Sequence, residues 1–568
     1  MTTQSSGGLS FLRKENIVAP EGYNRWRVPP ASIAIHLCIG SVYAWSVFNP
    51  PLTREMGVVA SAGSDWSLSS VVWIFSVAIV VLGLTAAVGG KWLEKVGPRY
   101  VGVVAAILWG GGFLIGSAGI VTHQLWLVYL GYGVFGGAGL GLGYVSPVST
   151  LIRWFPDRRG MATGMAIMGF GGGAIIGAPL KDWLLNLYYS KAPDYLGAES
   201  AVSLVTEGGR RFAETSNGLI EVVVASAEQA ASFGGEAGVY VVGTGDTGAA
   251  GAFLTLGIVY FVVMIIAAFQ YRVPREGWKP EGWEPPPAKS GMVTQNNVHI
   301  DQVLKTPQFY LLWIVLCFNV TAGIGVIGVA KTMINEIFGD LLIVTAAFAG
   351  TYVLMISVFN MVGRFFWAST SDFIGRKNTY HCFFVLGTIL YCTIPFWAGM
   401  GGTTALIGFY IVTMIIFTMY GGGFATIPAY LADIFGTMHV GGIHGRLLTA
   451  WSTAGVLGPF AITYLRDLSR NNAITDLVAQ IDPAFFAERF GAPVSQLREL
   501  VDANTVTIAN LMEIAPAGTI DPTPTLYNTT MYAMAALLVI AFFANLMVRP
   551  VASRHHVEQT HPSAAAAE

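Results

Sequence analysis

The chain has 568 residues, of which 54% are hydrophobic and only 11% are charged, and its net charge is −2. A soluble domain carries about 25% charged residues, so this composition excludes an ordinary soluble protein and predicts one that crosses a membrane many times. The balanced charge offers no basic surface for nucleic acid. The four cysteines have neither a disulfide framework nor a metal-ligand spacing.

Apolar segments of about 20 residues, long enough to cross a bilayer, recur along the chain. The first 28 residues are polar and are expected to be an N-terminal tail rather than a cleavable signal peptide. Six spans are predicted within 29–271, a polar middle loop at 272–307, six more spans within 308–548, and a C-terminal tail at 549–568. The predicted spans are 29–50, 68–90, 100–120, 124–150, 161–184, 249–271, 308–331, 343–370, 380–400, 403–433, 443–465 and 528–548.

Lysine and arginine gather in the tails and in alternate loops, which all lie on one side of the membrane if both termini do. The positive-inside rule therefore predicts cytoplasmic termini and a cell (inner or plasma) membrane location. The basic residues concerned are Arg13, Lys14, Arg25, Arg27, Lys91, Lys95, Arg99, Arg153, Arg158, Arg159, Arg275, Lys279, Lys289, Arg376 and Lys377.

Two long polar inserts fall on the opposite face, at about 187–248 and 467–527, after the fifth and eleventh spans. The first contains the β-prone runs IEVVVASAEQ and GVYVVG. The second contains DPAFFAERFG and PVSQLRELVDANTVTIANLM, which predict short amphipathic helices. They could form an external cap or be passive loop decoration, and the sequence leaves both open.

A short charged pattern occurs twice at one offset, as GKWLEKVGPRY after the second span and ASTSDFIGRKN after the eighth. In each copy the acid can cap a neighbouring helix N-terminus, and the base can hold a neighbouring helix end. Such a lock, broken and remade, suits the rocking of two bundles. The predicted gating residues are Gly90, Glu94, Gly97, Arg99, Asp372, Gly375, Arg376 and Lys377.

This pattern, G-x3-[DE]-x2-G-x-[RK], resembles the loop motif of the major facilitator superfamily, although the second copy has Ala368 in place of the first glycine. The resemblance implies an all-α membrane protein with twelve transmembrane helices in two six-helix bundles.

Four further stretches are more specific: GSVYAWSVFNPPL, GLGYVSPVSTLIRWFPDRRGMATG, REGWKPEGWEPP followed by TPQFYLLW, and NMVGRFFWASTSDFIGRKN. Together they resemble the oxalate/formate antiporter family of small-carboxylate carriers over all twelve spans. The two external inserts lie outside that family's compact pattern.

Arg364 lies inside the eighth span, eight residues before Asp372 and so about 12 Å from the end of its helix. A bilayer half is about 15 Å thick, which places the guanidinium near the midplane. No acid lies inside the spans, so a carboxylate ligand could supply the missing charge, as the resemblance implies. The alternative is an arginine bonded to backbone carbonyls of a broken helix. Asn360, one turn away, is expected to orient it.

Aromatic side chains are expected to wall the site. The resemblance implies that tyrosines of spans one and four, Tyr43 and Tyr144, line it, and Trp45 falls in the same motif as Tyr43. Tyr420 and Phe424 share one face of span ten and could close the other side. The alternative for each is ordinary packing.

The family's oxalate-carrying members place a lysine on span eleven before a Gly-Pro pair. Matching Gly458 and Pro459 puts Trp451 in its place, with packing as the alternative role. One buried cation balances a monoanion but not a dianion. The sequence therefore favours a monocarboxylate of the formate, lactate or pyruvate type over oxalate.

These features support three alternative hypotheses for the function. The first is alternating-access transport by anion exchange, in which only an anion resets the site. The second is proton symport, for which His36, on the same face as Tyr43, is the coupling candidate. The third is a carboxylate sensor on a carrier scaffold. An enzyme, a metal site and a cofactor are not expected, and the protein is expected to be a monomer in the lipid bilayer.

Overall fold

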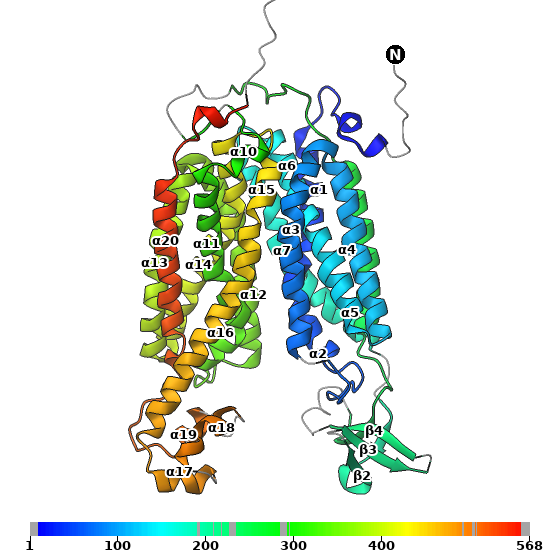
Figure 1. The fold of residues 1–568 in the computed structure, drawn as a ribbon, viewed down its shortest axis with the longest axis vertical. Coiled ribbons are helices and arrows are strands. Elements are labelled where there is room, and N and C mark those ends of the chain that lie inside the picture. The colour runs from blue at the N-terminus through cyan, green and yellow to red at the C-terminus, as the bar shows by residue number, and fades with distance from the viewer. Residues whose placement is uncertain are drawn as a thin grey trace, which may run out of the picture.

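The computed structural model describes residues 10–66, 68–189, 193–207, 210–216, 218–225, 235–284, 292–294, 296–490, 493–502, 506 and 508–557. Lys289 and parts of both inserts lie outside this set. Within it the chain forms two helical bundles joined by the middle loop (Figure 1).

The N-terminal bundle holds the six segments expected from the sequence. The first is not one continuous helix, because a 3-10 segment, η4, separates α1 from α2. The fourth likewise contains a π-helical stretch, η5. The bounds are α1 Val28–Gly40, η4 Ser41–Phe48, α2 Asn49–Leu52, α3 Leu68–Val96, α4 Pro98–Val121, α5 Leu125–Val128, η5 Tyr129–Gly136, α6 Gly137–Trp154, α7 Arg159–Tyr188 and α9 Ala249–Gln270.

The C-terminal bundle has the same arrangement, and its sixth helix lies at the edge of the molecule (Figure 1). Before it, the middle loop contains one short helix, α10. The bounds are α10 Ile300–Val303, α11 Pro307–Phe338, α12 Ala346–Ile374, α13 Arg376–Met400, α14 Gly402–Phe435, α15 Val440–Leu447, α16 Thr449–Val478 and α20 Asn528–Met547.

Among the described residues, eleven helical segments are long and apolar enough to cross a membrane. The remaining predicted span, α15–α16, is less apolar but runs along the bundle beside the others (Figure 1). The predicted all-α fold of two six-span bundles is therefore confirmed. Glycine permits close helix contacts: a Cβ on Gly112 of α4 would lie 2.6 Å from the carbonyl oxygen of Gly131 in η5.

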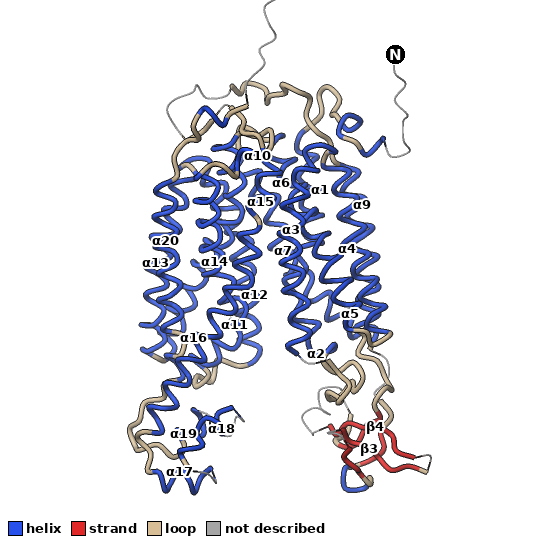
Figure 2. Tube along the Cα trace, in the orientation of Figure 1, coloured by secondary structure: helices blue, strands red, loops and turns tan. Residues whose placement is uncertain are grey.

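The two inserts differ in structure (Figure 2). The first forms an antiparallel sheet in the order β1-β5-β4-β3-β2. Both β-prone runs lie in it, IEVVVA in β4 and GVYV in β5. The strands are β1 Tyr195–Gly197, β2 Leu204–Glu207, β3 Arg210–Thr215, β4 Gly218–Ala225 and β5 Gly238–Val241. Tyr240 of the sheet packs with Val59 of the α2–α3 connection.

The second insert forms short helices, as expected, in its described part: α17 Pro483–Phe490, α18 Leu497–Asp502 and α19 Ile508–Met512. The helix of span eleven, α16, continues beyond the predicted end of the span at 465, as far as Val478. Leu477 of this extension and Leu511 of α19 are both buried in the same apolar core. Packing against the insert therefore stabilises the helix beyond the end of its apolar segment.

Both tails and the middle loop meet at one end of the molecule, here called the terminal end, and the inserts mark the insert end (Figure 1). Val18 of the N-terminal tail pairs with Val273 after α9, and Val298 of the middle loop pairs with His556 of the C-terminal tail. The described parts of the two tails therefore lie on one side, as the sequence predicted.

Candidate functional site

The two charged loops end one helix and begin the next by the same backbone device. Gly97 has φ +91°, and Gly375 has φ +85°. Side chains rarely adopt these values, so glycine is needed at both turns. Each turn carries its acid on the preceding helix and its base just after the turn.

The acids contact the opposite bundle. Glu94 of α3 accepts a hydrogen bond of 3.1 Å from the backbone N–H of Gly441, in the first turn of α15. Asp372 of α12 accepts bonds of 2.8 Å from the backbone N–H groups of Gly160 and Met161, in the first turn of α7. Each carboxylate thus caps the positive end of a helix in the other half.

The bases contact their own bundle. Arg99 Nη2 donates to the carbonyl oxygens of Phe269 and Tyr271, at 2.9 and 3.0 Å, where α9 ends. Lys377 Nζ donates in the same way to Leu546 and Val548, at 2.9 and 2.8 Å, where α20 ends. These are the contacts that the charge-lock hypothesis requires; their opening during transport stays a prediction.

A second set of ion pairs joins the halves beside Asp372. Arg376 donates to Asp372 at 2.6 Å and to Asp433 at 3.1 Å. Arg159 of the N-terminal half donates to the same Asp433 at 2.9 Å. All four groups lie at the terminal end, which these contacts hold closed.

The second loop has Ala368 where the first has Gly90, and a glycine on the partner helix allows the close approach there instead. In the first copy, a Cβ on Gly90 would lie 2.6 Å from the Cα of Gly442, so glycine allows α3 to approach α15. In the second copy Ala368 stands at that place. There the small residue is on α7, since a Cβ on Gly160 would lie 2.0 Å from the carbonyl oxygen of Ala368.

We expect Asp372→Asn to loosen the terminal end. An amide offers one oxygen where two backbone N–H groups and Arg376 now donate, which leaves a buried donor unsatisfied at about 1–3 kcal/mol. Hydrogen–deuterium exchange at Gly160 and Met161 should accelerate about 5- to 100-fold. Asp476→Asn, an exposed acid on the extension of α16, is the control. Unchanged protection of the α7 start in Asp372→Asn would refute the lock.

Arg364 is fully buried on α12. Its Nε donates to Asn360 Oδ1 at 3.0 Å, and its Nη1 donates to the carbonyl oxygen of Ile167 on α7 at 3.2 Å. Nη2 is buried and has no hydrogen-bond partner. Among the residues that the structure describes, no carboxylate pairs with this guanidinium, so its charge is uncompensated.

Aromatic rings from both halves surround the guanidinium. Its Cζ lies 5.7 Å from the ring centre of Phe170 on α7 and 5.4 Å from that of Phe424 on α14. Trp451 of α16 packs on both rings, at 5.4 and 4.7 Å. Tyr43 and Tyr144 join from η4 and α6, each within 5.4 Å of Phe170. Tyr420 follows, 5.5 Å from Phe424.

Most polar atoms of this cluster make no regular hydrogen bond within the protein. The hydroxyls of Tyr43, Tyr144 and Tyr420, the indole N–H of Trp451 and Arg364 Nη2 are buried without a hydrogen bond of normal geometry. The hydroxyl of Tyr43 nevertheless lies close enough to Arg364 and Tyr420 to interact with both. Buried polar atoms are nearly always hydrogen-bonded, so several unpaired donors around one cation indicate a ligand site. The group can bind one anion with a flat pair of oxygens, and its described residues include no carboxylate.

His36 of α1 lies beside this cluster, with its ring 5.2 Å from that of Tyr144. Its Nδ1 is 2.5 Å from the carbonyl oxygen of Ala166, and its Nε2 is 3.1 Å from that of Tyr144. His444 of α15 is also buried near Tyr144, and neither of its ring nitrogens has a partner.

Trp45 lies elsewhere. Its indole packs at 4.4 Å on Tyr132 and at 5.9 Å on Phe48, inside the N-terminal bundle. The break in η4 explains the difference, because Ala44 between Tyr43 and Trp45 has non-helical backbone angles (φ −94°, ψ 25°). Of the residues expected at the site, the structure brings together Arg364, Asn360, Tyr43, Tyr144, Tyr420, Phe424 and Trp451.

Sequence reasoning missed two residues. Phe170 is the ring at the centre of the cluster, and its only signal was a single aromatic within the glycine-rich run GFGGG. Lys181 is a second fully buried cation inside the predicted spans, and the sequence analysis did not single it out. Its Nζ donates to the carbonyl oxygens of Ser41 and Ala44, at 2.7 and 3.2 Å, and so stabilises the break that positions Tyr43. A charge within an apolar run was the signal that could have found it.

Lys181 does not alter the charge of the site. It lies fourteen residues after Ile167 on α7, which is about 21 Å along the helix.

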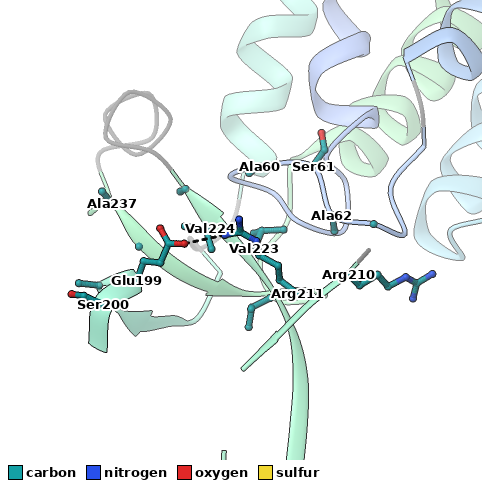
Figure 3. A pocket seen from close by; sticks show the side chains of 15 residues that line it. Ala60, Ser61, Ala62, Glu199, Ser200, Arg210, Arg211, Val223, Val224 and Ala237 are labelled. Atoms are coloured by element: carbon teal, nitrogen blue, oxygen red, sulfur yellow. Dashed lines mark hydrogen bonds and ion pairs between the residues drawn. The ribbon is translucent and has the colours of Figure 1, made fainter. Parts of the chain in front are cut away.

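A separate pocket at the insert end, between the sheet and the α2–α3 connection, is lined by Arg210 and Arg211 (Figure 3). These arginines pair with Glu221 and Glu199, at 3.6 and 3.1 Å, so that pocket has no surplus cation for an anion.

Comparison with known proteins agrees with this architecture. Residues 31–196 match the Major Facilitator Superfamily. The oxalate:formate antiporter of Oxalobacter formigenes is 25% identical over 490 residues, which cover 84% of this chain and 95% of that protein. YhjX, an uncharacterized MFS-type transporter of Escherichia coli, is 23% identical over 77% of this chain and 88% of its own length. Monocarboxylate transporter 13 of Rattus norvegicus is 34% identical, over 26% of this chain and 34% of its own.

Two solved structures share the fold. The fucose:proton symporter of E. coli superimposes with a TM-score of 0.53 at 11% identity, covering 91% of this chain and 97% of that one. A bacterial homologue of the iron transporter ferroportin superimposes with a TM-score of 0.54 at 10% identity, covering 91% and 98%. At these identities the likeness concerns the fold alone.

Proposed function

The chain is a secondary transporter of the major facilitator superfamily, akin to its oxalate/formate branch, and we propose that it carries small monocarboxylates by alternating access. The observation that supports this cargo most directly is Arg364, buried and uncompensated within a ring of unpaired donors. A carboxylate would accept from Nη2 and from the tyrosine hydroxyls, while the aromatic walls exclude water.

The charge of the site favours a monoanion. Arg364 is the one cation among the described residues of the aromatic cluster, and Trp451 occupies the place where the resemblance expects a lysine. A dianion would leave a net charge in a low-dielectric site. One relative is named an oxalate:formate antiporter and others monocarboxylate transporters, and the single cation favours the second group of substrates.

The proposed cycle is anion exchange. The terminal end is taken as cytoplasmic, because the basic loops gather there, in a cell (inner or plasma) membrane. The contacts of Glu94 and Asp372 close this end, so the described state would load from the insert end. Bound anion neutralises Arg364 and allows the halves to rock as a monomer in the bilayer, whereas the empty site returns slowly.

Counterflow in proteoliposomes tests the cargo. With labelled formate, lactate, pyruvate and oxalate, we expect a monocarboxylate to exchange fastest and oxalate to be slower by about tenfold or more, since an unbalanced buried charge weakens binding. Liposomes without protein are the blank. Faster exchange of oxalate would refute the monoanion argument. Binding without movement of label would instead indicate a sensor.

Proton symport is the second candidate, and His36 is the observation that favours it. Both of its neighbours are carbonyl oxygens, which accept, whereas a neutral imidazole has one N–H to donate. A second proton would satisfy both. The same counterflow assay with an imposed pH gradient separates the two candidates: uptake driven by the gradient and abolished in His36→Gln would favour symport, and indifference to the gradient favours exchange.

A further inference from the structure

A groove of about 700 Å³ crosses the boundary between the two halves at the terminal end. Its walls come from α3 on one side and from α11, α15 and the start of α16 on the other. The residues that line it include Val88, Lys91, Leu304, Tyr310, Trp313 and Arg446.

The groove lies close to the ends of membrane-spanning helices, the level at which lipid headgroups are expected. Lys91 is within two turns of the end of α3, and Tyr310 and Trp313 are within two turns of the start of α11. Val88 is 77% exposed and Tyr310 is 54% exposed, although both lie on membrane-spanning helices. Apolar and aromatic side chains exposed at this level face lipid rather than water.

The polar rim of the groove has one cation in excess. Asp301 of α10 pairs with Lys91 Nζ at 2.8 Å and with Arg446 Nη2 at 3.0 Å. Hydrogen bonds from these two bases lower the pKa of Asp301 to about 2, so this carboxylate stays ionised at neutral pH. Two bases and one acid leave a single positive charge beside an apolar wall.

We propose that this groove binds an anionic phospholipid, with its phosphate at Lys91 and Arg446 and an acyl chain along Val88 and Trp313. A basic pocket between membrane helices, level with the headgroups, has the charge and depth that such a lipid requires. Free phosphate would contact Lys91 and Arg446 but would gain nothing from the apolar wall. Because Lys91 belongs to one half and Arg446 to the other, the lipid stabilises the closed terminal end.

Lipid binding to the full-length protein in neutral detergent tests the site. Native mass spectrometry counts bound phosphatidylglycerol against phosphatidylcholine, and thermal unfolding reports the stabilisation. We expect phosphatidylglycerol to bind about fivefold to thirtyfold more tightly, as one or two basic residues near an anionic headgroup confer. Equal binding of the two lipids, or equal stabilisation by glycerol phosphate, would overturn the proposal.

Four variants separate a lipid site from a structural ion pair. Lys91→Gln should lose the preference, whereas Lys95→Gln, an exposed lysine one turn further along α3, should keep it. Asp301→Asn breaks the same ion pair but releases both cations, so the preference should persist or increase. Val88→Trp fills the groove without changing charge and should reduce the number of bound lipids. Loss of preference in Asp301→Asn, or its survival in Lys91→Gln, would contradict the assignment.

Discussion

Substitution of Arg364 by glutamine is expected to abolish carboxylate exchange while leaving the protein folded. Removing one partner of a buried, hydrogen-bonded charge pair weakens binding by about 2–5 kcal/mol, which is roughly 30- to 4000-fold. Arg364→Lys keeps the charge but not the planar pair of donors, so it should retain part of the binding. The measurement is substrate affinity by counterflow, with thermal unfolding of the same samples.

Two further variants sharpen this test. Arg158→Gln removes an exposed arginine from the loop before α7 and should leave exchange unchanged. Asn360→Asp places a carboxylate where Nε already donates, at 3.0 Å in the native protein. That acid would neutralise the guanidinium in place of the proposed anion, so anion binding should fall although the arginine remains. Normal exchange in Arg364→Gln would remove this residue from the binding site.

Substitution of Trp451 by lysine is expected to shift the preference toward dicarboxylates. The indole packs within 6.2 Å of Tyr43 and within 5.4 Å of Phe170, the ring beside the guanidinium. A lysine there would give the site two cations, which balance oxalate and overcharge a complex with formate. The ratio of oxalate to formate exchange should rise about tenfold or more, the effect of roughly 1.4 kcal/mol.

Trp451→Phe is the matched control, because it keeps an aromatic wall and adds no charge. Its ratio of oxalate to formate exchange should stay near that of the native protein. If Trp451→Lys is folded by thermal unfolding and the ratio is nevertheless unchanged, charge counting does not decide the cargo. Equal shifts in both variants would point instead to the volume of the indole.

The burial of Arg364 within a helix and the symmetry of the two charged loops could be predicted because each carried a local signal. A guanidinium in an apolar run of known length has a computable depth, and a repeated pattern at one offset reveals the symmetry of the two halves. That Glu94 and Asp372 cap helix N-termini was also predictable, since an acid at a helix end is stabilised there, but which helices they cap was not. Hydropathy alone was enough to predict the twelve spans in their order along the chain.

The sequence by itself therefore predicted the membrane architecture, the two charged loops and a cation inside a span. Only the tertiary structure decided which aromatic rings surround that cation. Phe170 and Trp45 are equally apolar residues in apolar spans, yet the first lies at the site and the second in the bundle core. The packing of the helices and the backbone break held by Lys181 make that choice, and apart from the charge of Lys181 within an apolar run neither has a local signal in the sequence.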